Sequence, residues 1–174
     1  MKFSKFLIFK IFLILVSSQF FNVPKAHSAE EIKIVYSIFS RTIKVNSLKN
    51  FAKKGRSTRK LKRILRATKS PDREIRAVLN KDFEVPITIA DKLIYSEIGN
   101  VFLTRLSSII HPPRANDERT GILSLRASVI QGIKLGNGKI NLINFFEAYP
   151  TKTVILDVSA LSKVMNKVES ISEL

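Results

Sequence analysis

The amino-acid sequence predicts a mainly α-helical protein, a small multi-helix domain with a short N-terminal β-hairpin and one C-terminal strand. Three observations support this class. Apolar residues recur at helical spacing over most of residues 46–168. Apolar–polar alternation is confined to the stretch 32–45, and β-branched residues gather at 153–158. We therefore expect a small sheet made by these two stretches in an otherwise helical domain.

The first 28 residues have the pattern of a cleavable secretory signal peptide. Lys2 and Lys5 form a positive start, and residues 11–16 are an unbroken apolar run. Ala26-His27-Ser28 then offers small residues before a cut at Ala29. An uncleaved membrane anchor is the alternative, but the apolar stretch is shorter than the ~20 residues that a membrane-spanning helix needs.

The expected organisation is a signal peptide over residues 1–28 and a single helical domain over residues 29–174. Such a leader predicts export, with the periplasm, the thylakoid lumen and the cell exterior as the open destinations. The chain has 174 residues, no cysteine and a net charge of +16. The absence of cysteine excludes disulfides, thiolate metal sites and a cysteine nucleophile. The leader holds four lysines and no acid, so about +12 remains after cleavage, which favours anionic partners.

The hairpin is predicted from two alternating runs separated by a polar break at Ser40-Arg41. The apolar positions of these runs are Ile32, Ile34, Tyr36, Ile43 and Val45. Asn46 or Ser47 can then cap a first helix, because a short side-chain oxygen satisfies free N–H groups there. Gly55 is expected to end this helix in the left-handed conformation. Its inner face would carry Leu48, Phe51 and Ala52.

Capping residues also mark the starts of the later helices. The expected starts are Ser57, Ser70-Pro71, Thr88 (with Asp91 in a capping box), Asn141 and Ser159. Prolines and glycines mark the ends. A helix from Val101 should stop at His111-Pro112-Pro113, and one over Ile122–Leu135 should end at the Gly136-Asn137-Gly138 turn. Thr153 to Val158 should form the C-terminal strand, followed by a helix through Val168.

Several of these residues form a pattern similar to a known family. The motifs are Ala29-Glu30-x-Ile32-x-x-x-Tyr36, Ile43-x-Val45-x-x-Leu48-x-x-Phe51-Ala52-x-x-Gly55, Leu123 to Ala127, Gly138-x-Ile140-x-Leu142, Tyr149-Pro150 and Val154-x-x-Asp157. Together they resemble the cyanobacterial domain of unknown function 1400, labelled alpha/beta hydrolase of unknown function. The resemblance covers the chain from about Ala29 to Asp157.

This resemblance implies a helical segment that precedes a serine-hydrolase domain in longer members of the family. The present chain ends at Leu174, so we expect no hydrolase part and carry over no catalytic residue. A hydrolase of that class presents its serine in a G-x-S-x-G elbow, and the sequence contains no such motif. His111 is the one histidine after the leader, and we interpret it as a helix C-terminal cap rather than a catalytic base.

No metal site or cofactor site is expected either. Asp117-Glu118 comes nearest to a metal-binding cluster, but it lacks the spacing of a calcium loop and is interpreted as a solvated loop. Gly136-x-Gly138 lacks the third glycine of a dinucleotide fingerprint and is interpreted as a turn.

The conspicuous feature is a basic run over residues 49–69, with ten cations and no acid. The candidate contacts to an anionic surface are Arg59, Lys60, Lys62, Arg63 and Arg66. Leu61, Ile64 and Leu65 give the same helix an apolar face, a pattern typical of a helix lying on anionic lipid. A core-packed helix with a solvated charged face is the favoured interpretation. Nucleic acid is disfavoured, because the run lacks aromatic stacking residues and export removes the usual partner.

Three functions therefore stand open. The first is an exported non-catalytic module that binds or supports an envelope protein or a secreted hydrolase. The second is peripheral association with anionic lipid through the basic helix. The third is the hydrolase activity that the family label implies, which the absent elbow disfavours. We expect no enzyme.

Overall fold

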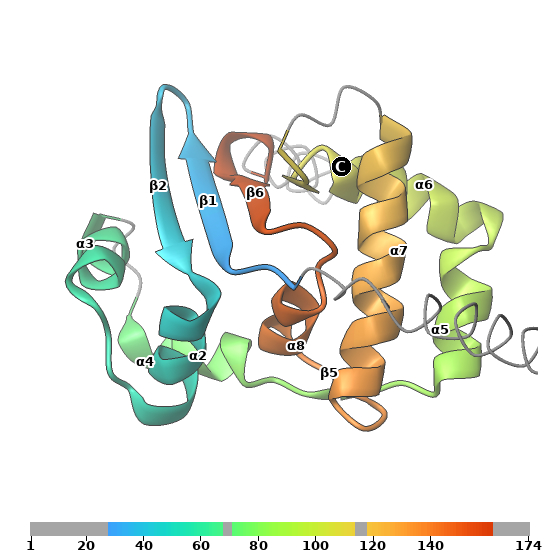
Figure 1. Cartoon of the computed structure of the whole chain (residues 1–174), viewed down its shortest axis with the longest axis horizontal. Coiled ribbons are helices and arrows are strands. Elements are labelled where there is room, and N and C mark those ends of the chain that lie inside the picture. Colours follow the sequence, from blue (N-terminus) through green and yellow to red (C-terminus); the bar gives the residue numbers. More distant parts are fainter. Residues whose placement is uncertain (1–27, 68–70, 114–117, 162–174) are drawn as a thin grey trace, which may run out of the picture.

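The computed structural model describes residues 28–67, 71–113 and 118–161, so all of the expected leader except Ser28 lies outside it. In Figure 1 the sheet lies with α2, α3 and α4 toward one end of the molecule, and α5 and α6 lie at the other end. Helices α7 and α8 lie between these two groups. In chain order the elements are β1 (Glu31–Tyr36), β2 (Phe39–Lys44), α2 (Val45–Lys54), α3 (Arg59–Ala67), α4 (Asp72–Leu79), β3 (Phe83–Glu84), α5 (Ile87–Ile94), α6 (Glu97–Ser107), β4 (Ile110–His111), α7 (Glu118–Leu135), β5 (Lys139–Ile140), α8 (Leu142–Glu147) and β6 (Thr153–Asp157).

The predicted mainly α-helical class, with an N-terminal hairpin and a C-terminal strand, is confirmed. Strands β1 and β2 form the hairpin, and β6 pairs with β1 in parallel, so the two predicted strand regions do share one sheet. The sheet has the order β2-β1-β6-β4, which leaves β2 and β4 at its edges. Two features were not predicted: the short strand β4, and a separate two-stranded sheet made by β3 and β5.

The hairpin turn lies three residues earlier than the predicted polar break. Ile32 pairs with Ile43, so the centre of the hairpin falls between Ser37 and Ile38. Ser37 has φ 52°, the positive value that two-residue hairpin turns require. Ser40 and Arg41 therefore lie inside β2 rather than in a turn.

The start of α2 differs from the prediction. Val45, expected in a strand, begins the helix, and the N-cap is Lys44 without any side-chain hydrogen bond. The Val45 N–H donates to the Glu30 carbonyl at 2.9 Å, so the pairing with the β1 side of the sheet continues into the first residue of the helix. Gly55 ends the helix with φ 68°, as predicted.

Later helix starts are partly as predicted. Asn141 caps α8 and accepts a hydrogen bond from the Asn144 N–H at 2.8 Å, as expected. Thr58, not Ser57, accepts from the first turn of α3. Thr88 lies inside α5, whose N-cap is Pro86, so the predicted capping box is wrong. Ser70 and Val168 lie outside the described residues.

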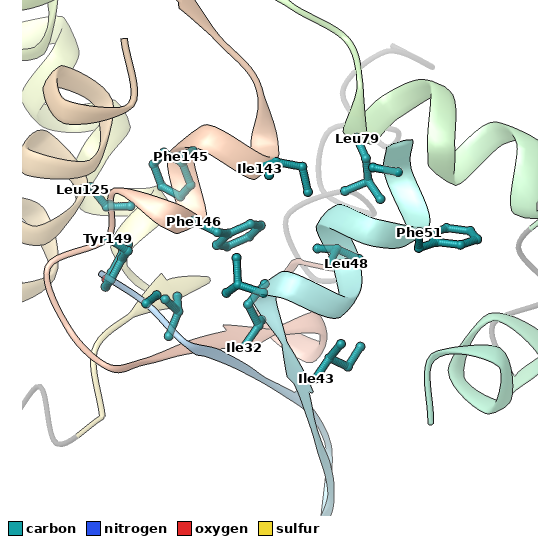
Figure 2. Packing of buried hydrophobic residues seen from close by; sticks show 14 of the residues in the cluster. Ile32, Ile43, Leu48, Phe51, Leu79, Leu125, Ile143, Phe145, Phe146 and Tyr149 are labelled. Atoms are coloured by element: carbon teal, nitrogen blue, oxygen red, sulfur yellow. The ribbon is translucent and has the colours of Figure 1, made fainter. Parts of the chain in front are cut away.

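The core joins the sheet to the helices around α2 and α8. Figure 2 shows Ile143 and Phe146 of α8 facing Leu79 of α4 and Leu48 of α2. Full burial of each such side chain stabilises the fold by about 1.5–3 kcal/mol. The inner face predicted for the first helix is confirmed, because Leu48, Phe51 and Ala52 are all buried.

Helix α7 carries the contact between the core and the outer pair α5–α6. Leu125 and Ile133 on α7 are buried. The buried residues of α6 are Gly99, Leu103 and Ser107, and two of them are small. A Cβ built on Gly121 of α7 would lie 2.9 Å from the Ser107 Cβ, so these two helices approach closely. This close packing determines which α6 side chains remain outside.

Candidate binding surfaces

His111 lies in strand β4, not at a helix end. It pairs with Ile155 of β6, so the predicted role as a helix cap is wrong. The helix stops at Ser107 because the chain turns to add β4 to the sheet edge. The His111 Nδ1 lies 3.0 Å from the Pro112 carbonyl oxygen.

Of the acidic candidates, only Glu118 is described. Asp117 lies outside the described residues, and Glu118 belongs to the first turn of α7 rather than to a loop. In the described part of the chain, no group of three or more histidine, cysteine, aspartate or glutamate side chains could hold a metal ion. None of the helices described there is long and apolar enough to cross a membrane.

The pKa values of Tyr149 and Glu84 are shifted by burial and by a surface ion pair, respectively. Burial raises the pKa of Tyr149, and a weaker interaction with Ser124 opposes that rise. The Tyr149 hydroxyl has no partner at hydrogen-bonding geometry among the described residues. On the surface, a 2.8 Å ion pair and hydrogen bond from Lys139 lower the pKa of Glu84, joining β3 to β5. Neither group adjoins His111 or the basic helix.

Helix α3 uses its apolar side for the core. Leu61 and Leu65 are buried in the main cluster, and Ile64 packs against it. The exposed cations on the other side of the helix are the five that the sequence singled out, and we call them the basic face of α3: Arg59, Lys60, Lys62, Arg63 and Arg66. The helix therefore cannot lay its apolar side on lipid without leaving the core, and only the charges are available.

The rest of the described basic run lies on α2 and the loop after it. Lys49 forms a 2.6 Å ion pair with Glu147 of α8, which neutralises it. Lys54 and Arg56 line a hollow that Thr58, the residue before α3, also lines. Lys69 lies outside the described residues.

A groove separates α3 from strand β2. It encloses about 730 Å³, and we call it the edge groove; its lining residues are Tyr36, Phe39, Ser40, Arg41, Thr42, Lys60, Arg63 and Ile64. A second hollow of about 460 Å³ shares Thr42 and Lys60 with it and continues toward Lys44. Sequence reasoning found Lys60 and Arg63 but not their neighbour Arg41, because the turn was placed on that residue.

Helices α5 and α6 expose large apolar side chains at helical spacing. We call these residues the apolar stripes of α5 and α6: Ile89, Leu93, Ile98, Val101 and Phe102. Ile98 is 79% exposed and Phe102 is 62% exposed. On α5 the neighbouring Ile94 is buried, whereas Leu93 is exposed. The small residues Gly99 and Ser107 could have indicated from the sequence which side of α6 is buried, because small residues allow close packing.

Polar contacts fix the position of this pair of helices. The Arg126 guanidinium of α7 donates to the Ile94 carbonyl at 3.1 Å and to the Asn100 side chain at 3.1 Å. The same guanidinium lies 4.5 Å from the centroid of the Tyr95 ring. The apolar stripes therefore sit on a rigid support.

Comparison with known proteins gives one match. A family described as alpha/beta hydrolase of unknown function (DUF1400) matches residues 28–157, a range that includes the edge groove and both apolar stripes. No curated protein and no solved structure matches the chain.

Proposed function

This chain belongs to the family described as alpha/beta hydrolase of unknown function (DUF1400), and from that premise we propose that it is an exported, non-catalytic module. Its role is to bind a protein partner, either a secreted hydrolase or an envelope protein, through the apolar stripes of α5 and α6. The family label names an activity, whereas the proposed role is support or recruitment of another protein.

The observation that carries this proposal is the exposure of Ile98, Val101 and Phe102 on one side of α6. Residues at positions i, i+3 and i+4 of a helix share a face. Apolar residues grouped on such a face mark interaction sites, because water solvates them poorly until a partner covers them. An interface of this kind gains its affinity from burial and loses little of it at high salt.

Co-purification from the native envelope fraction tests the partner. We expect a protein partner that stays bound to the tagged protein at high salt. Replacing Ile98 and Phe102 together with serine should weaken the complex at least about tenfold, because central aromatic and aliphatic contacts contribute about 2 kcal/mol or more. Lys53→Ser, at an exposed position of α2 at the other end of the molecule (Figure 1), is the control and should change nothing. A partner that binds the double variant as tightly as the native protein would contradict the proposal.

The non-catalytic part predicts no esterase turnover. The sequence contains no G-x-S-x-G elbow, and His111 lies in β4 with its Nδ1 beside a backbone carbonyl. Purified protein should therefore hydrolyse short acyl esters at the rate of buffer alone. Turnover that a single serine substitution abolishes would show a nucleophile and overturn this part.

The second candidate function is contact with anionic lipid through the basic face of α3, favoured by its five exposed cations. Each basic residue near an anionic membrane contributes about 1 kcal/mol. Changing Lys60, Lys62 and Arg63 together to alanine should then reduce vesicle binding more than a hundredfold, or about 3 kcal/mol. Lys92, Arg105 and Lys134 are exposed elsewhere, so their triple alanine variant is a control of equal charge. Vesicle binding that is absent, or insensitive to salt, would end this candidate.

A further inference from the structure

Strand β2 leaves one side of its backbone without a partner strand. It is an edge strand of six residues, without proline. The Val45 N–H bonds to Glu30, so alternation along an antiparallel pair makes Ile43, Arg41 and Phe39 the residues bonded to β1. The N–H groups of Ser40, Thr42 and Lys44 and the C=O groups of Ser40 and Thr42 therefore point away from β1, whereas the Lys44 C=O belongs to the start of α2. Among the described residues β2 is at the edge of its sheet, so no further strand bonds to them.

The hollows described above lie along this free side. Ser40 and Thr42 line the edge groove, and Thr42 and Lys44 line its continuation. Helix α3 forms the opposite wall through Lys60 and Arg63, and Figure 1 shows this helix on the β2 side of the sheet. An added strand lies about 4.8 Å from its neighbour, and the groove leaves open space of about 730 Å³ beside β2.

The chemistry of the groove specifies its ligand. Arg41, Lys60 and Arg63 place cations on both walls, and Tyr36 and Phe39 add exposed aromatic surface at the hairpin tip. Among the described residues, Glu31 is the one acid that lines either hollow, and it lines the continuation rather than the edge groove. Unprotected edge strands bind extended peptides through main-chain hydrogen bonds, while side-chain pockets give specificity.

We propose that β2 accepts an extended acidic segment of a partner protein as an additional strand of the sheet, with its carboxylates beside Arg41, Lys60 and Arg63. This inference rests on the proposed function in taking a protein as the partner. It uses the opposite end of the molecule from the apolar stripes (Figure 1). Pairing of two copies through β2 is opposed by charge, because each copy would bring the same cations to the contact.

The direct test uses synthetic six-residue peptides of alternating glutamate and valine, blocked at both ends. Calorimetry should detect salt-sensitive binding to the native full-length protein. Methylation of alternate backbone nitrogens removes ladder donors but keeps every charge, and it should weaken binding at least about tenfold. The same peptide with lysine in place of glutamate should not bind.

Variants of the protein separate the ladder from the charges. Thr42→Pro removes an N–H on the free side without removing a bond to β1, and it should weaken peptide binding about tenfold. Thr42→Ala keeps that N–H and should bind as the native protein does. Lys60→Glu with Arg63→Glu should abolish binding, whereas Lys62→Glu with Arg66→Glu, on the same helix but outside the groove, should retain most of it.

The native protein with the methylated peptide keeps the test decisive even if Thr42→Pro fails to fold. Equal affinity for methylated and unmethylated peptides would overturn strand addition, as would anionic vesicles binding in the groove where the peptide does not. Either result would leave the partner complex at the apolar stripes intact. Loss of that complex in the Ile98 and Phe102 variant, with peptide binding unchanged, would locate the two contacts independently.

Discussion

Replacing Gly99 with alanine should destabilise the protein by about 3 kcal/mol. A Cβ at this position would lie 1.9 Å from the Leu93 carbonyl oxygen and 3.1 Å from the Ile94 Cα, both backbone atoms of α5. These atoms can give way only if α5 and α6 separate. In an ordinary helix interior the same change stabilises by about 1 kcal/mol, so the sign of the effect is diagnostic.

Urea denaturation of the two proteins measures this effect. Val101→Ala, on the exposed side of the same helix, is the control and should shift the free energy of unfolding by no more than about 0.5 kcal/mol. A Gly99→Ala protein as stable as the native one would show that α5 and α6 do not meet as described. The apolar stripes would then lose the rigid support that the proposed function assumes.

Truncating Leu61 to alanine should cost about 2–5 kcal/mol, because its side chain is only 2% exposed and belongs to the main core cluster. This prediction discriminates between two roles of the basic helix. If the apolar side of α3 is core, stability falls and any vesicle binding by the cations persists in the folded fraction. If that side instead enters lipid, stability is unchanged and vesicle binding falls.

Thermal or urea unfolding in the absence of lipid gives the answer for Leu61. Lys62→Ala, one residue further along α3 and exposed, should change the free energy of unfolding by less than about 0.5 kcal/mol. Equal stability of the two variants would contradict the packing of α3 against the core. It would also favour the alternative that the apolar side of α3 enters lipid.

Local patterns predicted much of the fold. The hairpin, the turn at Gly136–Gly138, the Asn141 cap and the C-terminal strand each depend on residues close in the sequence, and all are present. The wrong predictions concern features that depend on residues distant in the sequence. The pairing of Ile32 with Ile43 moved the hairpin turn, and α2 starts at Val45, whose N–H bonds to the Glu30 carbonyl, before the predicted caps Asn46 and Ser47. Strand β4 exists only because β6 lies beside it.

The binding surfaces were harder to predict than the fold. Charge alone identified the basic face of α3, but the groove depends on Arg41, which β2 brings opposite that helix. The apolar stripes were not predicted, because apolar residues at helical spacing identify a helix face but do not show whether that face is buried or exposed. On α6 the close approach of Gly99 to α5 and of Ser107 to α7 places the small residues inside and leaves Phe102 outside.

Photo-crosslinking from α6 tests the central claim most directly, namely that the module binds a protein partner through the apolar stripes. A photoreactive amino acid would replace Ile98 in one protein and Lys62 of α3 in another, each expressed in the native cell. The account predicts a discrete protein adduct from position 98 that survives high salt and disappears when Phe102→Ser is added. An adduct from position 62 alone, or lipid adducts at either position, would contradict it.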